Sequence, residues 1–153
     1  MLTTDEIYAI FDGDSLARAF LHSNTWTGNA LGVAAALAAL DVYADEEILA
    51  AVTAGGAILR AELGALVANR PFLRRPRGVG MMAAIDLVTP EGHPLDTQLR
   101  TGRRVYREAV ARGALLRPLG DTMYLFPPLN TRGEDLRAML AVLADSVDDV
   151  LGR

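Results

Sequence analysis

The segment "GALLRPLGDTMYLFPPL", residues 113–129, holds two short runs of strand-forming residues separated by a turn. The runs are "ALLRP" and "TMYLF", and the connecting residues "LGD" have the length of a β-hairpin loop. Gly113 precedes the first run at a position typical of a helix C-cap, and Pro127-Pro128 follows the second run and ends it. The segment therefore predicts an antiparallel hairpin that follows a helix.

The sequence on either side of this hairpin predicts helices and one further strand. Leu95 to Arg112 is an amphipathic helix, and Arg132 to Leu151 is a second one with its apolar residues on one face. The segment "VGMMAAIDLV" from Val79 alternates as a strand does, whereas "RPFLRRPRG" before it, with two prolines, predicts a loop.

Two longer helices are expected in the amino-terminal half, from Asn29 and from Asp45 to Asn69, after a short helix at residues 4–11. Gly55 and Gly56 in the second of these indicate a kink or a tight crossing. The predicted fold class is α+β, with a few-stranded sheet covered by helices. We expect two parts, an arm with a linking helix at residues 1–43 and a small α+β domain at residues 44–153.

Composition excludes several kinds of chemistry. The net charge of -4 argues against a nucleic-acid surface, and no cysteine is present for disulfides, thiolate metal sites or a cysteine nucleophile. All 15 basic residues are arginine, so no lysine side chain can form a Schiff base. The uncharged run from Ala30 to Leu40 is too short to cross a bilayer, and a cytoplasmic protein without a membrane partner is expected.

Arg117 is the first candidate for a binding residue, because it lies among leucines in the hairpin. A guanidinium in such surroundings needs a carboxylate, a phosphate or several carbonyls as a partner. Its planar donors suit a bidentate carboxylate ligand. A structural ion pair with Asp121 or Asp86 is an equally good interpretation of the sequence.

Two further segments are candidates for anion binding. The helix that begins near Asn29 offers free backbone N–H groups to a phosphate, and Ser23, Thr25 and Thr27 could add hydroxyl donors. These polar residues are also ordinary helix caps, and capping is the favoured interpretation. The arginine cluster at residues 74, 75 and 77 is interpreted as a solvated face.

Two segments, "FLHSNTWTGNALGVAAALAAL" and "GALLRPLGDTMYLFPPL", together resemble the carboxy-terminal portion of the class III, pyridoxal-phosphate-dependent aminotransferases of fold type I. The resemblance implies the carboxy-terminal small domain of that fold, with an N-terminal helical arm. It also implies pyridoxal phosphate as the cofactor, with Asn24 and Thr25 contacting its phosphate in a partner subunit. The substrate would be contacted by Ser23, Arg117 and Tyr124. Arg117 would bind the carboxylate of the substrate.

The resemblance leaves three interpretations open, because the family's Schiff-base lysine has no counterpart in this sequence. The chain is an aminotransferase part that supplies binding residues to a complementary lysine-bearing half or within a homo-oligomer. Alternatively it is a non-catalytic binding or dimerisation module, or a truncated remnant without activity. Under each interpretation we expect the chain alone to be inactive as an aminotransferase, and we expect no metal site.

Overall fold

The computed structural model describes residues 3–21 and 26–152, which form two compact units, Met1–Ala39 and Leu40–Arg153. The predicted division at residues 43 and 44 falls within the helix α2 (Ala30–Asp45), close to the division between the units. The exact boundary of the arm stays a prediction.

The first unit is built from short helical segments. They are α1 (Asp5–Phe11) and the 3-10 turn η1 (Leu16–Arg18), followed by the start of α2. Arg18 donates hydrogen bonds to the carbonyl oxygens of Ile10 and Ala9, at 3.0 and 3.1 Å, and so closes the carboxyl end of α1. Asn29 caps α2, because its side-chain oxygen accepts a hydrogen bond from the N–H of Gly32 at 3.0 Å.

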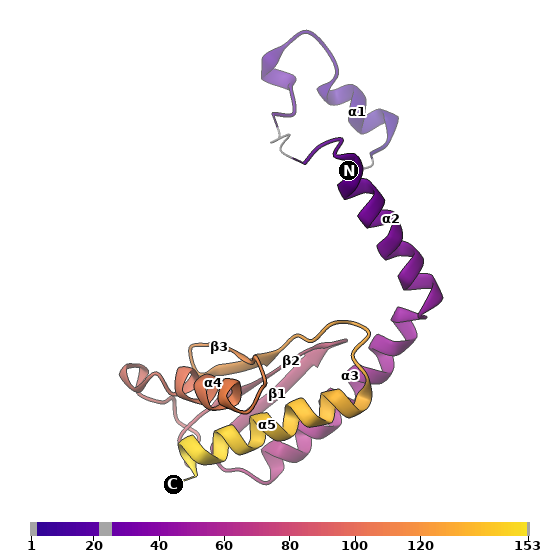
Figure 1. Cartoon of the computed structure of the whole chain (residues 1–153). Helices are drawn as coiled ribbons and strands as arrows, with labels where there is room; N and C mark the ends of the chain where they lie inside the picture. Colours follow the sequence, from indigo (N-terminus) through magenta and orange to yellow (C-terminus); the bar gives the residue numbers. More distant parts are fainter. Residues whose placement is uncertain (1–2, 22–25, 153) are drawn as a thin grey trace. The chain divides into compact units, whose positions relative to one another are not determined.

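The second unit contains one antiparallel sheet in the order β1-β2-β4-β3. Its strands are β1 (Leu73–Val79), β2 (Met82–Leu87), β3 (Arg117–Leu119) and β4 (Thr122–Leu125). The long helices α3 (Ile48–Ala68) and α5 (Gly133–Leu151) pack together along one face of this sheet (Figure 1). The shorter α4 (Thr101–Ala111) packs on α5 and β3.

The core lies between the sheet and these helices. Period-two alternation directs Ala83, Ile85 and Leu87 of β2 to the helices, and all three are buried. The opposing helices contribute buried leucines and valines at helical spacing: Leu59, Leu63, Val105, Leu136, Leu140, Leu143 and Val147. Burial of each such side chain stabilises the fold by about 1.5–3 kcal/mol.

The crossing of α3 over the turn between β1 and β2 confirms the tight contact indicated by the glycine pair. A Cβ atom at Gly56 would lie 2.5 Å from the carbonyl oxygen of Gly80, so only glycine permits this approach. The far end of the same helix is held by Arg70, which donates two hydrogen bonds to the Asp148 carboxylate of α5 at 2.8 and 2.7 Å.

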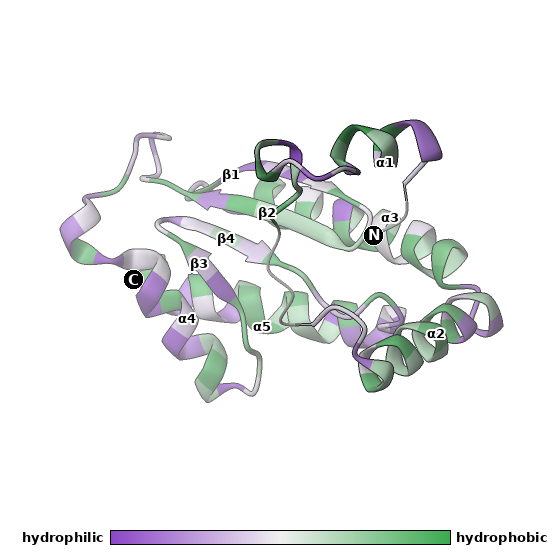
Figure 2. Ribbon diagram, turned by 90° about the horizontal axis from the view of Figure 1, so that it is seen from above, coloured by the Kyte–Doolittle hydropathy of each residue, from purple (hydrophilic) through white to green (hydrophobic). Residues whose placement is uncertain are grey.

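Helix α3 is long and apolar enough to cross a membrane by length and composition alone. Its buried residues, however, form one face that includes Leu59 and Leu63, and this face packs on β1 and α5. That arrangement is the one expected of a core helix. By contrast, α2 is hydrophobic over most of its length and has no buried residue (Figure 2).

Two sequence predictions were wrong about elements of this unit. The segment predicted as a loop contains β1, which accommodates Pro76 in an irregularity of the β1–β2 register between Arg74 and Arg77. Val79 belongs to this strand and is exposed. The predicted helix Leu95–Arg112 forms from Thr101 onward as α4, but its predicted start is wrong: residues before it form a 3-10 turn, η2 (Thr97–Leu99), which Arg100 at a φ of 47° separates from α4.

Candidate functional site

The helix-free face of the sheet carries a row of side chains that crosses all four strands. In the register, Arg77 of β1 is opposite Ala84 of β2, Ala84 is opposite Tyr124 of β4, and Tyr124 is opposite Arg117 of β3. Directly opposed residues of antiparallel strands have their side chains on the same face of the sheet. Arg117 and Tyr124, which the resemblance proposes as substrate contacts, are therefore direct neighbours.

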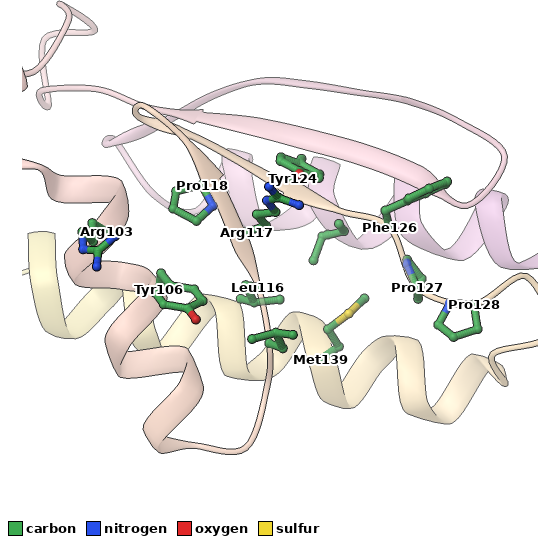
Figure 3. A pocket seen from close by; sticks show the side chains of 12 residues that line it. Arg103, Tyr106, Leu116, Arg117, Pro118, Tyr124, Phe126, Pro127, Pro128 and Met139 are labelled. Atoms are coloured by element: carbon green, nitrogen blue, oxygen red, sulfur yellow. The ribbon is translucent and has the colours of Figure 1, made fainter. Parts of the chain in front are cut away.

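A cavity of about 780 Å³ opens beside this hairpin (Figure 3). Its polar side chains are Arg103 and Tyr106 of α4, Arg117 of β3 and Tyr124 of β4. The rest of its lining is apolar: Leu115, Leu116, Pro118, Leu125, Phe126, Pro127, Pro128 and Met139. The lining contains no aspartate or glutamate, so the cavity combines positive charge with a hydrocarbon wall. Such a surface suits a ligand with an anionic group and an apolar chain.

Arg117 is exposed rather than buried among the neighbouring leucines, because its strand lies at the edge of the sheet. Within residues 3–21 and 26–152, no carboxylate lies within 4.0 Å of its guanidinium. The alternative of an ion pair with Asp121 or Asp86 is therefore wrong. Asp121 accepts a hydrogen bond from the N–H of Gly102 at 3.1 Å, and Asp86 is engaged by other arginines.

Asp86 is the acidic centre of the neighbouring part of the sheet. It accepts hydrogen bonds from Arg77 at 2.8 Å and from the hydroxyl of Thr122 at 2.7 Å, and Arg75 lies 3.5 Å away. Partial burial raises the pKa of the Asp86 carboxyl, but these hydrogen bonds and positive charges outweigh burial and hold the pKa below its ordinary value. Arg75 and Arg77 are exposed, as expected of a solvated face, but they lie on strand β1 rather than on a loop and join β1 to β2 through Asp86.

We expect Asp86→Asn to lower the free energy of unfolding by about 1–2 kcal/mol at pH 7, since a charged hydrogen-bond acceptor is lost. The folded-state pKa of Asp86 is depressed. Its stabilisation is therefore present above the unfolded-state value of about 4 and is lost as pH falls through the folded-state pKa. Urea unfolding of both proteins between pH 7 and 3 should show their difference shrinking below about pH 4. Glu134→Gln, which removes an exposed ion pair with Arg132, should change little and serves as the control. A difference for Asp86→Asn that is constant with pH would contradict this role.

The other predicted contacts fall elsewhere in the chain. Ser23, Asn24 and Thr25 lie outside the described residues, so their assignments to substrate and cofactor phosphate stay predictions. Among the described residues the side chain that caps α2 is Asn29, and the capping interpretation of Ser23 and Thr25 stays a prediction.

Sequence reasoning missed Arg103 and Tyr106, which line the cavity from α4. Arg103 is exposed and Tyr106 is half-buried on an ordinary amphipathic helix, and no local signal separates them from the other residues of α4 that are not buried. Only the packing of α4 against the hairpin brings them to Arg117, so the sequence pattern alone could not have selected them.

The sequence of this chain matches a known protein family. The family described as aminotransferase class-III matches residues 1–147. This chain belongs to the class-III aminotransferases. The match confirms the family named from the two motifs.

Individual class-III aminotransferases are similar to this chain in sequence and in structure. An adenosylmethionine-8-amino-7-oxononanoate aminotransferase of Synechococcus elongatus is 37% identical over 149 residues, covering 97% of this chain and 34% of that protein. The crystal structure of the enzyme of that name from Methanocaldococcus jannaschii has a TM-score of 0.84 at 28% identity, over 97% of this chain and 34% of its own. The structure of an amine transaminase from an uncultivated Pseudomonas species in a PLP-bound form has a TM-score of 0.82 at 31% identity. The match covers 94% of this chain and 33% of the transaminase.

These matches test the predicted fold class and the predicted type of aminotransferase. The α+β fold expected for a carboxy-terminal portion of a fold-type I aminotransferase is confirmed. The motif Arg117-Pro-Leu-Gly with Tyr124-Leu and Pro127-Pro128 is predicted to resemble that of adenosylmethionine-8-amino-7-oxononanoate aminotransferases, and relatives of that name support the likeness. The chain spans 34% of the length of these relatives.

Proposed function

We propose that this chain is the carboxylate-binding, carboxy-terminal part of a cytoplasmic aminotransferase of biotin biosynthesis that transfers an amino group to 8-amino-7-oxononanoate. One observation carries the proposal: an exposed guanidinium, Arg117, without a protein carboxylate within 4.0 Å in the described chain, stands beside Tyr124 in a largely apolar cavity. The substrate named for the relatives has a carboxylate at the end of a nine-carbon chain, which matches such a cavity.

Pyridoxal phosphate belongs to this proposal as the cofactor, since it supplies the electron sink for amino transfer. Its covalent attachment requires a lysine amine, and the sequence contains no lysine. The described residues do not include the expected phosphate contacts Asn24 and Thr25. This chain therefore does not fit the covalent cofactor site by itself, and we assign it no step at the reacting carbon.

The partner that this function requires is a lysine-bearing polypeptide, with which the chain, or a homo-oligomer of it, completes the active site. A second candidate function is a non-catalytic dimerisation module. The exposed apolar residues of α2, including Leu31, Leu37 and Leu40, favour association of either kind. Sedimentation of this chain mixed with the lysine-bearing polypeptide separates the two candidates: a complementary half sediments together with that polypeptide, whether or not it also forms a homo-oligomer, whereas a module forms a dimer of this chain that leaves the polypeptide free. Another class-III aminotransferase acting on ω-amino acids is the alternative for the substrate.

The test of the proposed function is Arg117→Ala. We expect the free energy of unfolding to change by less than about 0.5 kcal/mol, because an exposed side chain without a protein partner is removed. Binding of nonanoate, followed by calorimetry, should weaken about 10- to 100-fold, the effect of losing a charged hydrogen bond. Arg107→Ala is the matched control, since Arg107 is an exposed arginine of α4 outside the cavity lining.

Two outcomes would contradict the carboxylate-receptor assignment. The first is a loss of about 3–5 kcal/mol in stability, which is the mark of a broken buried ion pair. The second is unchanged nonanoate binding in Arg117→Ala.

A further inference from the structure

The cavity beside the hairpin contains a second guanidinium that the proposed function does not use. Arg103 lines the cavity from the first turn of α4 and is exposed. In the part of the chain that the structure describes, no acidic group lies within 4.0 Å of its guanidinium. Two arginines therefore line one cavity that has no acidic side chain in its lining, so both guanidiniums are available to anionic groups of a ligand.

The place of Arg103 is fixed by the contact between α4 and the hairpin. A Cβ atom at Gly102 would lie 2.1 Å from the carbonyl oxygen of Gly120, so the helix approaches the turn more closely than any other residue allows. The carboxylate of Asp121, in the same turn, accepts the N–H of Gly102 at 3.1 Å. Arg103 follows Gly102 directly, and these two contacts hold its backbone beside the hairpin.

The two arginines enter the cavity from different points along the hairpin. Gly120 lies three residues after Arg117, which corresponds to roughly 10 Å of extended chain. Arg103 is thus anchored near the turn, whereas Arg117 stands at the start of β3. In Figure 3 Arg103 extends from α4, and Arg117 lies next to Tyr124. Apolar lining residues, among them Leu116 and Pro118, complete the wall.

We propose that Arg103 is a second anion-binding residue, which makes the cavity a site for molecules with two carboxylates separated by an apolar chain. The proposal rests on the proposed function, since it assumes that Arg117 binds the first carboxylate. A guanidinium at each end of the site matches a charge at each end of the ligand. An acid with one carboxylate leaves Arg103 solvated and gains nothing from it.

The test compares two probes of equal length, nonanedioate and nonanoate, by calorimetric titration of the full chain. We expect nonanedioate to bind about tenfold more tightly than nonanoate. Arg103→Gln should remove that preference by weakening nonanedioate about tenfold while leaving nonanoate within about twofold. Arg107 is an exposed arginine of the same helix outside this cavity lining, so Arg107→Gln should leave the affinities for both probes unchanged. Circular dichroism checks that each variant is folded.

The possible failures are distinguishable. If nonanoate binds and depends on Arg117 but Arg103→Gln affects neither probe, the second site is wrong and the proposed function stands. Equal weakening by Arg103→Gln and Arg107→Gln would indicate a general charge effect and would also overturn the second site. If neither probe binds the unaltered chain, the carboxylate-binding function fails, and the inference fails with it.

Discussion

Gly56→Ala is expected to lower the free energy of unfolding by about 3 kcal/mol, near the upper end of the usual range for overpacking. The new methyl group would lie 2.5 Å from the carbonyl oxygen of Gly80, a backbone atom that cannot move without shifting the β1–β2 turn. The β1–β2 turn determines the pairing register of β2 with β1. Strand β2 also pairs with β4, where Ala84 is opposite Tyr124. We therefore expect this substitution to destabilise the fold and to displace Tyr124 in the cavity lining.

Two glycines of the same helix provide matched controls. A Cβ atom at Gly64 would have no heavy atom within 4 Å, so Gly64→Ala should raise the free energy of unfolding by about 0.5–1 kcal/mol through helix propensity. At Gly55 the close atom is the sulfur of Met81, at 2.6 Å, which belongs to a flexible side chain. Gly55→Ala should therefore cost less than Gly56→Ala. Urea unfolding of the three variants gives this order, and equal effects at residues 56 and 64 would contradict a tight helix crossing.

The elements that sequence reasoning predicted well are those determined by local pattern. The hairpin was recognised from two strand-forming runs around "LGD", and it forms with Gly120 at a φ of 61° in the turn. The last helix was recognised from its apolar face, and Leu136, Leu140 and Leu143 are buried as expected. In both cases neighbouring residues alone carry the information, so an isolated sequence was sufficient.

The elements that sequence reasoning missed depend on partners distant in the chain. Strand β1 contains Pro76, a poor strand former, and three charged arginines instead of an apolar alternation, and it is held by pairing with β2 and by the ion pairs of Asp86. The same reason explains Arg103, whose place in the cavity depends on a contact between Gly102 and the hairpin turn. A charged residue in an amphipathic segment has no local signal for such a contact.

The site was predictable in part, and only through resemblance. Spacing alone left Arg117 equally suited to a ligand and to a structural ion pair, and the family motif favoured the ligand. The structure removes the ion-pair alternative, because Asp86 and Asp121 bind other groups. The roles of Ser23, Asn24 and Thr25 depend entirely on the resemblance and stay predictions.

The second large effect is an all-or-none result in cofactor attachment. After incubation with pyridoxal phosphate and reduction with borohydride, we expect no pyridoxyl adduct on any side chain of this protein. The physical reason is that only an amine forms the reducible imine, and all 15 basic residues are arginine, whose guanidinium stays protonated. The chain's amino terminus is the remaining amine and is the sole position at which an adduct is expected. Peptide mass spectrometry locates it.

Arg107→Lys is the control that makes this negative result informative. It introduces one exposed amine on α4, outside the proposed carboxylate cavity, and it should acquire an adduct at residue 107 under the same conditions. A side-chain adduct in the unaltered chain would contradict the expectation. When the lysine-bearing polypeptide of the proposed enzyme is added, the new adduct should appear on that polypeptide. An active, labelled complex would support the complementary half, whereas a complex that neither labels nor transfers an amino group would favour the dimerisation module.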